Sequence, residues 1–181
     1  METLYITGAG VSSDSGIPTF RGTDGFWTIG SENYTPQEMA TRYMYVNNSE
    51  QFLLWYFKRF ARYRDAEPND VHRWLADKNL ITQNIDGLDG KAGNTSYIPI
   101  HGRLDKVTVF EEEGQDSLVI DAPWDEISDL GFTHENDPKS EASLINTLLE
   151  YFKIKKDKQQ KYYPVLGYSL KPFVLLFDEI Y

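Results

Sequence analysis

The chain has 181 residues, 40% of them hydrophobic and 14% aromatic, which is enough to bury the core of a single domain. Its formal net charge of −10 argues against direct nucleic-acid binding, which usually needs a basic face. The lack of cysteine excludes disulfides and thiolate metal sites. No apolar run of about 20 residues or signal peptide is found, so we expect a soluble, intracellular, cytoplasmic protein without membrane contact.

The first predicted element is a short apolar strand that runs into Gly8, Ala9 and Gly10. Such a turn lets the backbone approach an anionic ligand, and its N–H groups can point at phosphate. The spacing departs from Gly-x-Gly-x-x-Gly, because Ser13 occupies the place of the third glycine. A tight turn that binds nothing gives the same pattern, so these residues alone leave both interpretations open.

The loop after this turn ends on an aromatic residue and a cation, Phe20 and Arg21. Gly16 and Pro18 interrupt any long helix, so we expect both residues on a loop. Such a pair is suited to covering a heteroaromatic ring and binding a phosphate or carboxylate. The alternative is a phenylalanine in the core and a solvated arginine.

A helix is predicted over residues 50–64, with Asn47-Asn48-Ser49 as its cap. Its apolar residues form a wide stripe, which is more often core than a binding face. The stripe consists of Phe52, Leu53, Tyr56, Phe57, Phe60 and Tyr63.

Polar residues follow the next predicted strand, Leu80-Ile81. Gln83, Asn84 and Asp86 stand where an open α/β sheet places its ligand, and the last two suit an amide. An Asx turn leading to Gly87 is the alternative. His101 ends a further short strand, and a single histidine of this kind is more often structural than catalytic.

The remaining chain predicts a hairpin followed by a helix. Residues 107–110 and 118–120 flank an acidic tip, and Asp137-Pro138 precedes an apolar pattern of helical period, 144–152. A run of lysines follows, which is either an interaction surface or a solvated helix end. These lysines are Lys153, Lys155, Lys156, Lys158 and Lys161.

Taken together, these segments resemble the signatures of the sirtuins. The first signature is matched by Gly8-Ala9-Gly10-Val11-Ser12, Ser15-Gly16-Ile17-Pro18 and Phe20-Arg21; the second by residues 82–88; and the third by His101-Gly102. Glu67-Pro68-Asn69 with His72 is similar to the stretch before the family's second strand. The resemblance covers residues 2–102, is faint over 103–170 and returns at 170–179.

The resemblance implies an α/β fold with a Rossmann-like, doubly wound parallel sheet. We expect a single domain, 1–181, with a small helical insertion and a zinc-free second module. In this division residues 1–30 and 79–102 form the NAD-binding core, 31–78 the helical insertion, 103–170 the replaced zinc module and 171–181 a returning core strand.

The resemblance also implies an NAD-dependent protein lysine deacylase, which transfers the acyl group to ADP-ribose and releases nicotinamide. Its partner would be an acyl-lysine protein or peptide. His101 would be the general base and Asn84 a second catalytic residue. The cofactor NAD would be held by Gly8, Ala9, Gly10, Ser15, Phe20, Arg21, Gln83, Asn84 and Asp86.

Two departures from the family pattern qualify this interpretation. Most sirtuins hold a structural zinc with Cys-x-x-Cys pairs, and we expect no metal here because the chain has no cysteine. The family also continues beyond the position of Tyr181 with segments that bind the adenosine half of NAD. We therefore expect a shortened chain that self-associates or is completed by a partner chain. The alternatives are a non-catalytic nucleotide- or protein-binding module, and an NAD hydrolase or ADP-ribosyltransferase.

Overall fold

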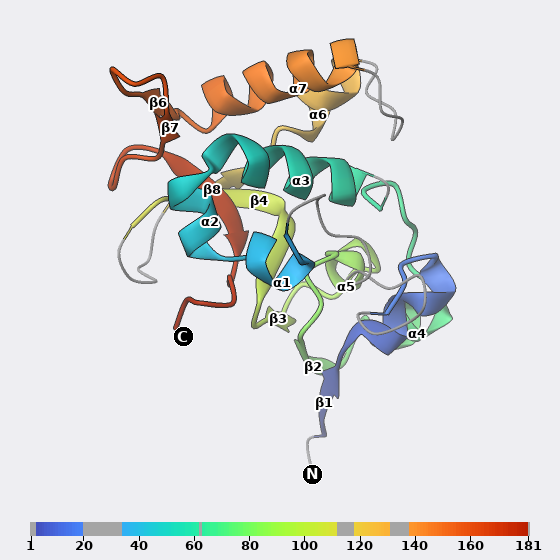
Figure 1. Ribbon diagram of the computed structural model, residues 1–181. Coiled ribbons are helices and arrows are strands. Elements are labelled where there is room, and N and C mark those ends of the chain that lie inside the picture. The colour runs from blue at the N-terminus through green and yellow to red at the C-terminus, as the bar shows by residue number, and fades with distance from the viewer. Residues whose placement is uncertain (1–2, 20–33, 62, 112–117, 131–137, 181) are drawn as a thin grey trace.

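The computed structural model describes residues 3–19, 34–61, 63–111, 118–130 and 138–180, without the side chains of 138–140. The elements lie in two regions (Figure 1). Three short strands and α4 and α5 form one end of the molecule, and the longer helices with a second sheet form the other.

A parallel sheet orders the first region. It has three strands in the order β1 (Leu4–Thr7), β2 (Asn79–Thr82) and β3 (Ile98–Pro99). The register pairs Thr7 with Thr82 and Thr82 with Pro99, so the carboxyl ends of the strands lie at one edge. The predicted α/β fold with a Rossmann-like parallel sheet is thereby confirmed.

Short helices connect these strands. The 3-10 helix η1 (Ala9–Ser15) follows β1 and ends at Gly16, whose positive φ of 82° is easily reached by glycine. Before β2 lies α4 (Asp70–Trp74), and after it lies α5 (Leu88–Lys91). The Asn69 side chain accepts hydrogen bonds from the backbone N–H groups of Val71 and His72. This cap explains why α4 begins directly after Asn69.

In the described part of the segment between η1 and α4 lie the helices α1 (Pro36–Met39), α2 (Arg42–Asn47) and α3 (Ser49–Ala61). The predicted helix over 50–64 is α3. Its apolar stripe from Phe52 to Phe60 is buried, so it serves the core and not an open binding face.

A second, antiparallel sheet follows, in the order β5 (Val119–Asp121), β4 (Gly102–Val109) and β8 (Leu170–Val174). Val107 pairs with Ile120, so the predicted hairpin is confirmed, and most of its acidic tip lies outside the described residues. β8 was expected to return to the core sheet with residues 171–181. It pairs with β4 instead, where Leu170 and Val174 are buried with Leu104 and Val107.

The last helices and strands are α6 (Trp124–Asp129), α7 (Pro138–Tyr151), β6 (Lys155–Lys156) and β7 (Tyr162–Tyr163). The helix predicted over 144–152 is α7. The lysine run continues into the β6–β7 hairpin, where Lys156 Nζ lies 4.9 Å from the ring centre of Tyr162.

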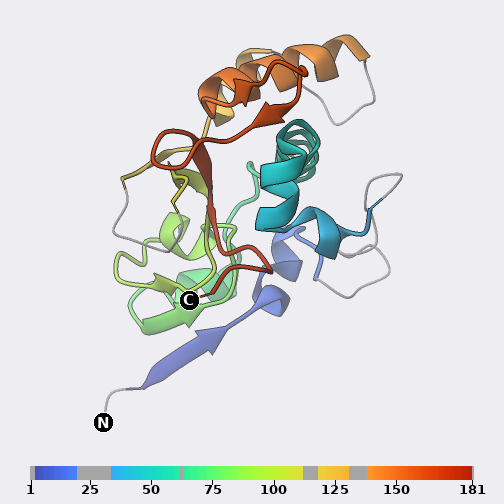
Figure 2. The same cartoon turned by 60° about the vertical axis from the view of Figure 1, so that its left-hand side comes forward.

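One apolar core joins the helical segment to the region after β4. Phe57 of α3 lies 5.5 Å from Phe152, beyond α7, and 4.9 Å from Trp124 of α6 between ring centres. Figure 2 shows α7 and α6 stacked beyond α3, with the parallel strands at the opposite end. The helices of the segment 31–78 and the region after β4 therefore pack against each other.

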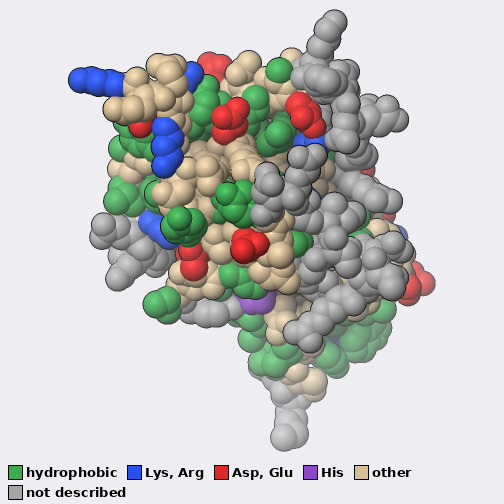
Figure 3. All heavy atoms as spheres, viewed as in Figure 1, with side chains coloured by type: hydrophobic (Ala, Val, Ile, Leu, Met, Phe, Trp, Pro, Cys, Tyr) green, Lys and Arg blue, Asp and Glu red, His purple; other side chains and the backbone are tan. Residues whose placement is uncertain are grey.

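The parallel sheet keeps part of its apolar surface exposed. Leu4, Ile6 and Ile98 are 55%, 68% and 55% exposed. Figure 3 shows hydrophobic side chains gathered at the end of the molecule that carries β1 and α4. Within the described part of the chain, no helix has the length and hydropathy needed to cross a membrane.

We predict that Leu148→Ala destabilises the protein by about 2–5 kcal/mol, because Leu148 is 0% exposed and its truncation leaves a cavity between α7 and α3. Leu118→Ala is the matched control. That leucine is 67% exposed, so its loss should cost less than about 0.5 kcal/mol. Urea unfolding measures both, and equal losses would contradict a core centred on α3 and α7.

Candidate active site

The carboxyl ends of the three parallel strands bring the predicted site residues to one edge. Gly8 follows β1, Gln83 follows β2 and His101 follows β3 by two residues. The Gln83 N–H donates to Thr7 O at 3.1 Å and the Ile100 N–H donates to Thr82 O at 3.0 Å. The strand ends are thus held in register up to the site itself.

The glycine turn leaves its backbone accessible. A Cβ placed on Gly10 would meet nothing within 4 Å, and one placed on Gly8 would lie 3.7 Å from Gln83 Oε1. Gly8 is extended, with φ of −151°, so here glycine provides room and not a special backbone conformation. This open backbone suits close approach of a ligand.

His101 is oriented by the loop after β2. Its Nδ1 lies 2.9 Å from Gln83 O, and because a carbonyl oxygen only accepts, Nδ1 must carry the hydrogen. The lone pair of the neutral ring is then on Nε2. This is the tautomer that a general base requires.

A buried polar network joins the glycine turn to the loop after β2. Asn84 Nδ2 donates to Gly8 O and to Ser12 Oγ, both at 3.1 Å. Ser12 Oγ donates to Asp86 Oδ2 at 2.6 Å, and Asp86 Oδ1 accepts the Leu88 N–H at 2.9 Å. Ser12 and Asn84 are 1% and 7% exposed. Asp86 therefore makes the Asx turn considered above and also anchors Ser12.

The predicted residues differ in how firmly the structure connects them. Gly8, Asn84 and Asp86 form one hydrogen-bonded group, and Gln83 and His101 form another. Ser15 is bonded to Asn69, whose Nδ2 donates to Ser15 Oγ at 3.1 Å. Ala9 and Gly10 belong to η1 beside them. Phe20 and Arg21 lie outside the described residues.

Sequence reasoning omitted Ser12, Asn69 and His72 from the site. Ser12 is close to two other serines, Ser13 and Ser15, and nothing local marks it as the one that contacts Asp86. Asn69 followed by His72 three residues later has the spacing of a helix cap, which was the available signal for α4. That this cap lies against η1, through Asn69 Nδ2 and Val11 O at 2.7 Å, requires the tertiary structure.

A buried carboxyl lies behind this network. Asp89 of α5 is 2% exposed, and burial raises the pKa of its side chain. The nearby His72 and a hydrogen bond with Thr82 oppose this rise in the pKa, whereas the carboxylate of Asp86 adds to it. Holding Asp89 ionised in the folded protein therefore has a cost.

The charged and polar groups of the site do not resemble a metal centre. Among the described residues, no group of three or more His, Cys, Asp or Glu side chains is placed to hold a metal ion. The expectation of a zinc-free protein stays a prediction, which metal analysis of the purified protein can test.

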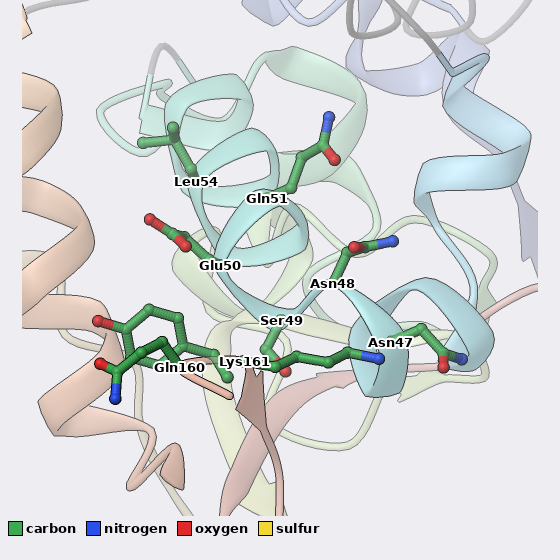
Figure 4. Close-up of a pocket in the computed structure, with 9 residues that line it drawn as sticks. Asn47, Asn48, Ser49, Glu50, Gln51, Leu54, Gln160 and Lys161 are labelled. Carbon is green, nitrogen blue, oxygen red and sulfur yellow. The ribbon is translucent and has the colours of Figure 1, made fainter. Parts of the chain in front are cut away.

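A separate hollow of about 410 Å³ lies at the junction of α2 and α3. Figure 4 shows Asn48, Ser49, Glu50 and Gln51 at the start of α3, with Gln160 and Lys161 facing them from the β6–β7 connection. The lining contains none of the predicted site residues. This hollow is therefore distinct from the strand-end site.

The chain is similar to known proteins in both sequence and fold. The model of the Sir2 family matches residues 8–126. The chain is 43% identical over 112 residues to NAD-dependent protein deacylase 1 of Caldanaerobacter subterraneus subsp. tengcongensis, covering 58% of this chain and 45% of that protein. It is 42% identical over 108 residues to NAD-dependent protein deacylase 1 of Archaeoglobus fulgidus, covering 56% and 42%.

The fold is similar to that of a solved Sir2 homolog–NAD complex. The TM-score is 0.60 at 30% sequence identity, and the match covers 98% of this chain and 58% of that one. The chain spans under half of the length of the two curated relatives above.

We predict that Asp89→Asn stabilises the protein at neutral pH. The folded pKa of Asp89 lies above its ordinary value of 3.8, so its ionisation destabilises the folded state as pH rises through the folded pKa. Asparagine stays neutral and retains an acceptor for Thr82. The Tm difference between variant and wild type should be largest near about pH 7 and vanish well below pH 3.8, where Asp89 is protonated in both states. Thermal unfolding of both proteins across this range tests this, and a difference that grows toward acid pH would contradict it.

Proposed function

The chain belongs to the Sir2 family, and we propose that it acts as an NAD-dependent protein lysine deacylase. The observation that carries this proposal is the edge of the parallel sheet. There a glycine turn with open backbone, the Ser12–Asn84–Asp86 network and an oriented His101 follow three adjacent strands. An acyl-lysine protein or peptide is the proposed substrate.

The residues at this edge fit NAD. The open space at Gly10 admits a phosphate beside backbone N–H groups, with Gly8, Ala9 and Ser15 around it. Beside Asn84, Asp86 offers acceptors to the N–H groups of a carboxamide: each of its carboxylate oxygens accepts a hydrogen bond from the protein and has further lone-pair capacity. Gln83 is proposed to face a ribose. When bound, NAD supplies an electrophilic ribose carbon and the nicotinamide leaving group.

His101 is proposed as the general base. Because Gln83 O holds the Nδ1 hydrogen, Nε2 is the nitrogen able to accept a proton from a ribose hydroxyl. Imidazole suits this step because it titrates near neutral pH. General-base catalysis of this kind typically contributes about 10²–10⁴-fold in rate.

Asn84 is proposed to act beside the reacting centre. Its side-chain nitrogen is committed to Gly8 O and Ser12 Oγ, and its own N–H donates to Thr82 Oγ1 at 3.1 Å. The amide is therefore fixed in orientation before any ligand binds. Such pre-organisation reduces the cost of ordering the site on binding.

The deciding experiment follows nicotinamide release from NAD with and without an acetyl-lysine peptide. Peptide-dependent release supports deacylation. Peptide-independent release would instead indicate NAD hydrolysis or ADP-ribosyl transfer to water or to another acceptor. No release under either condition would indicate a nucleotide- or protein-binding module without catalysis.

We predict that His101→Ala lowers peptide deacylation by about 10²–10⁴-fold, because the variant lacks the imidazole proposed to take the ribose proton. Exchange of labelled nicotinamide into NAD, which does not need this proton transfer, should persist in the variant. Deacylation is measured by loss of the acetyl group in mass spectra. Near wild-type turnover would rule out His101 as the base.

A further inference from the structure

A histidine that the proposed reaction does not use is buried directly behind the site. His72 of α4 is 0% exposed, although imidazole is a polar group that costs free energy to bury without partners. Its two ring nitrogens face two different parts of the molecule. Nδ1 faces the cap of its own helix, and Nε2 faces Ser12 of η1.

The hydrogen-bond partners assign the tautomer of His72. The backbone N–H of Asn69 donates to His72 Nδ1 at 3.3 Å, so Nδ1 carries the lone pair and Nε2 the hydrogen of the neutral ring. Nε2 lies 3.5 Å from Ser12 Oγ. His72 therefore presents a donor to the serine.

This donor restricts what the Ser12 hydroxyl can do. Ser12 Oγ also faces the Asn84 amide, which donates to it at 3.1 Å. A hydroxyl oxygen has two lone pairs and one hydrogen, and here two donors face the lone pairs. Its hydrogen is left to point at Asp86, and the Ser12 Oγ to Asp86 Oδ2 distance is 2.6 Å.

The orientation of the Ser12 hydroxyl thus affects Asp86, whose carboxylate is proposed to bind the carboxamide. Asp86 Oδ2 is held by Ser12 and Oδ1 by the Leu88 N–H. With both oxygens anchored on the protein side, their remaining lone pairs keep one orientation. Without the His72 donor, one lone pair of Ser12 Oγ loses its partner, and the hydroxyl that donates to Asp86 Oδ2 is held less firmly.

We infer that His72 is a positioning residue, which orients Ser12 and through it Asp86 for the carboxamide of nicotinamide. This inference rests on the proposed function, because it assigns a task within the same pocket. It predicts an effect on ligands that carry the carboxamide. If His72 only filled space, its replacement by an apolar side chain of similar shape would change the stability of the protein and leave its affinity for these ligands unchanged.

The experiment compares His72→Leu with His72→Gln. Leucine removes the donor, and we expect the KM for NAD and the inhibition constant of nicotinamide to rise about tenfold, as for loss of one oriented polar contact. Glutamine places an amide N–H near the position of Nε2, so both constants should return to within about threefold of wild type. His72→Asn carries the same amide on a shorter chain that does not reach Ser12, and it should behave like His72→Leu.

Asn94→Ala is the matched control for a structural effect. Asn94 is 2% exposed, and its amide donates to Leu75 O at 2.9 Å and Lys78 O at 3.0 Å, on the chain between α4 and β2. Its loss should lower Tm and leave the nicotinamide constant unchanged. Unchanged constants in folded His72→Leu, or constants in folded His72→Gln as poor as those in His72→Asn, would overturn the inference.

The same variants separate this inference from the proposed function. If wild type releases no nicotinamide, the proposed catalysis fails, and calorimetric titration with NAD then tests His72. Weaker NAD binding by His72→Leu with recovery in His72→Gln would still support positioning. Should wild type also fail to bind NAD, both the function and the inference are overturned. If His72→Leu does not fold, the comparison of His72→Gln with His72→Asn decides the outcome.

Discussion

The hydrogen bond from Ser12 to Asp86 is the contact on which the site depends. It joins the helix after the first strand to the loop after the second, at 2.6 Å and largely out of water. Parallel strands alone bring their ends to a common edge, but they do not orient the loops that follow. Hydrogen bonds from Asn84 to Gly8 and Ser12 add to this contact and hold η1 against the loop after β2.

The second constraint is apolar and lies farther from the chemistry. A chain without cysteine cannot use thiolates to hold a small module, and here aromatic packing between α3, α6 and α7 takes that role. β4 links this packed body to the site, because it begins at Gly102 immediately after His101. Packing around β4 and β8 therefore also fixes where the histidine lies.

The sequence was most informative where local pattern and tertiary role coincide. The period of apolar residues in α3 and α7 predicted both helices, since one face of each had to be buried. The polar residues after the predicted strands indicated the edge of the sheet that carries the candidate site, because the carboxyl ends of parallel strands meet at one edge. Pairing was less predictable: β8 has the composition of a core strand, and only its register with β4 shows which sheet it joins.

By itself, the sequence determined the α/β class and the family resemblance, and it predicted that Gly8, Asn84, Asp86 and His101 follow the ends of neighbouring strands. The tertiary structure alone decided that the helical segment and the region after β4 share a core, and that His72 lies behind Ser12. These contacts join residues far apart in the chain; Ser12 and His72, for instance, are separated by 60 positions. Local propensity has no term for such contacts, because they exist only after the elements have packed.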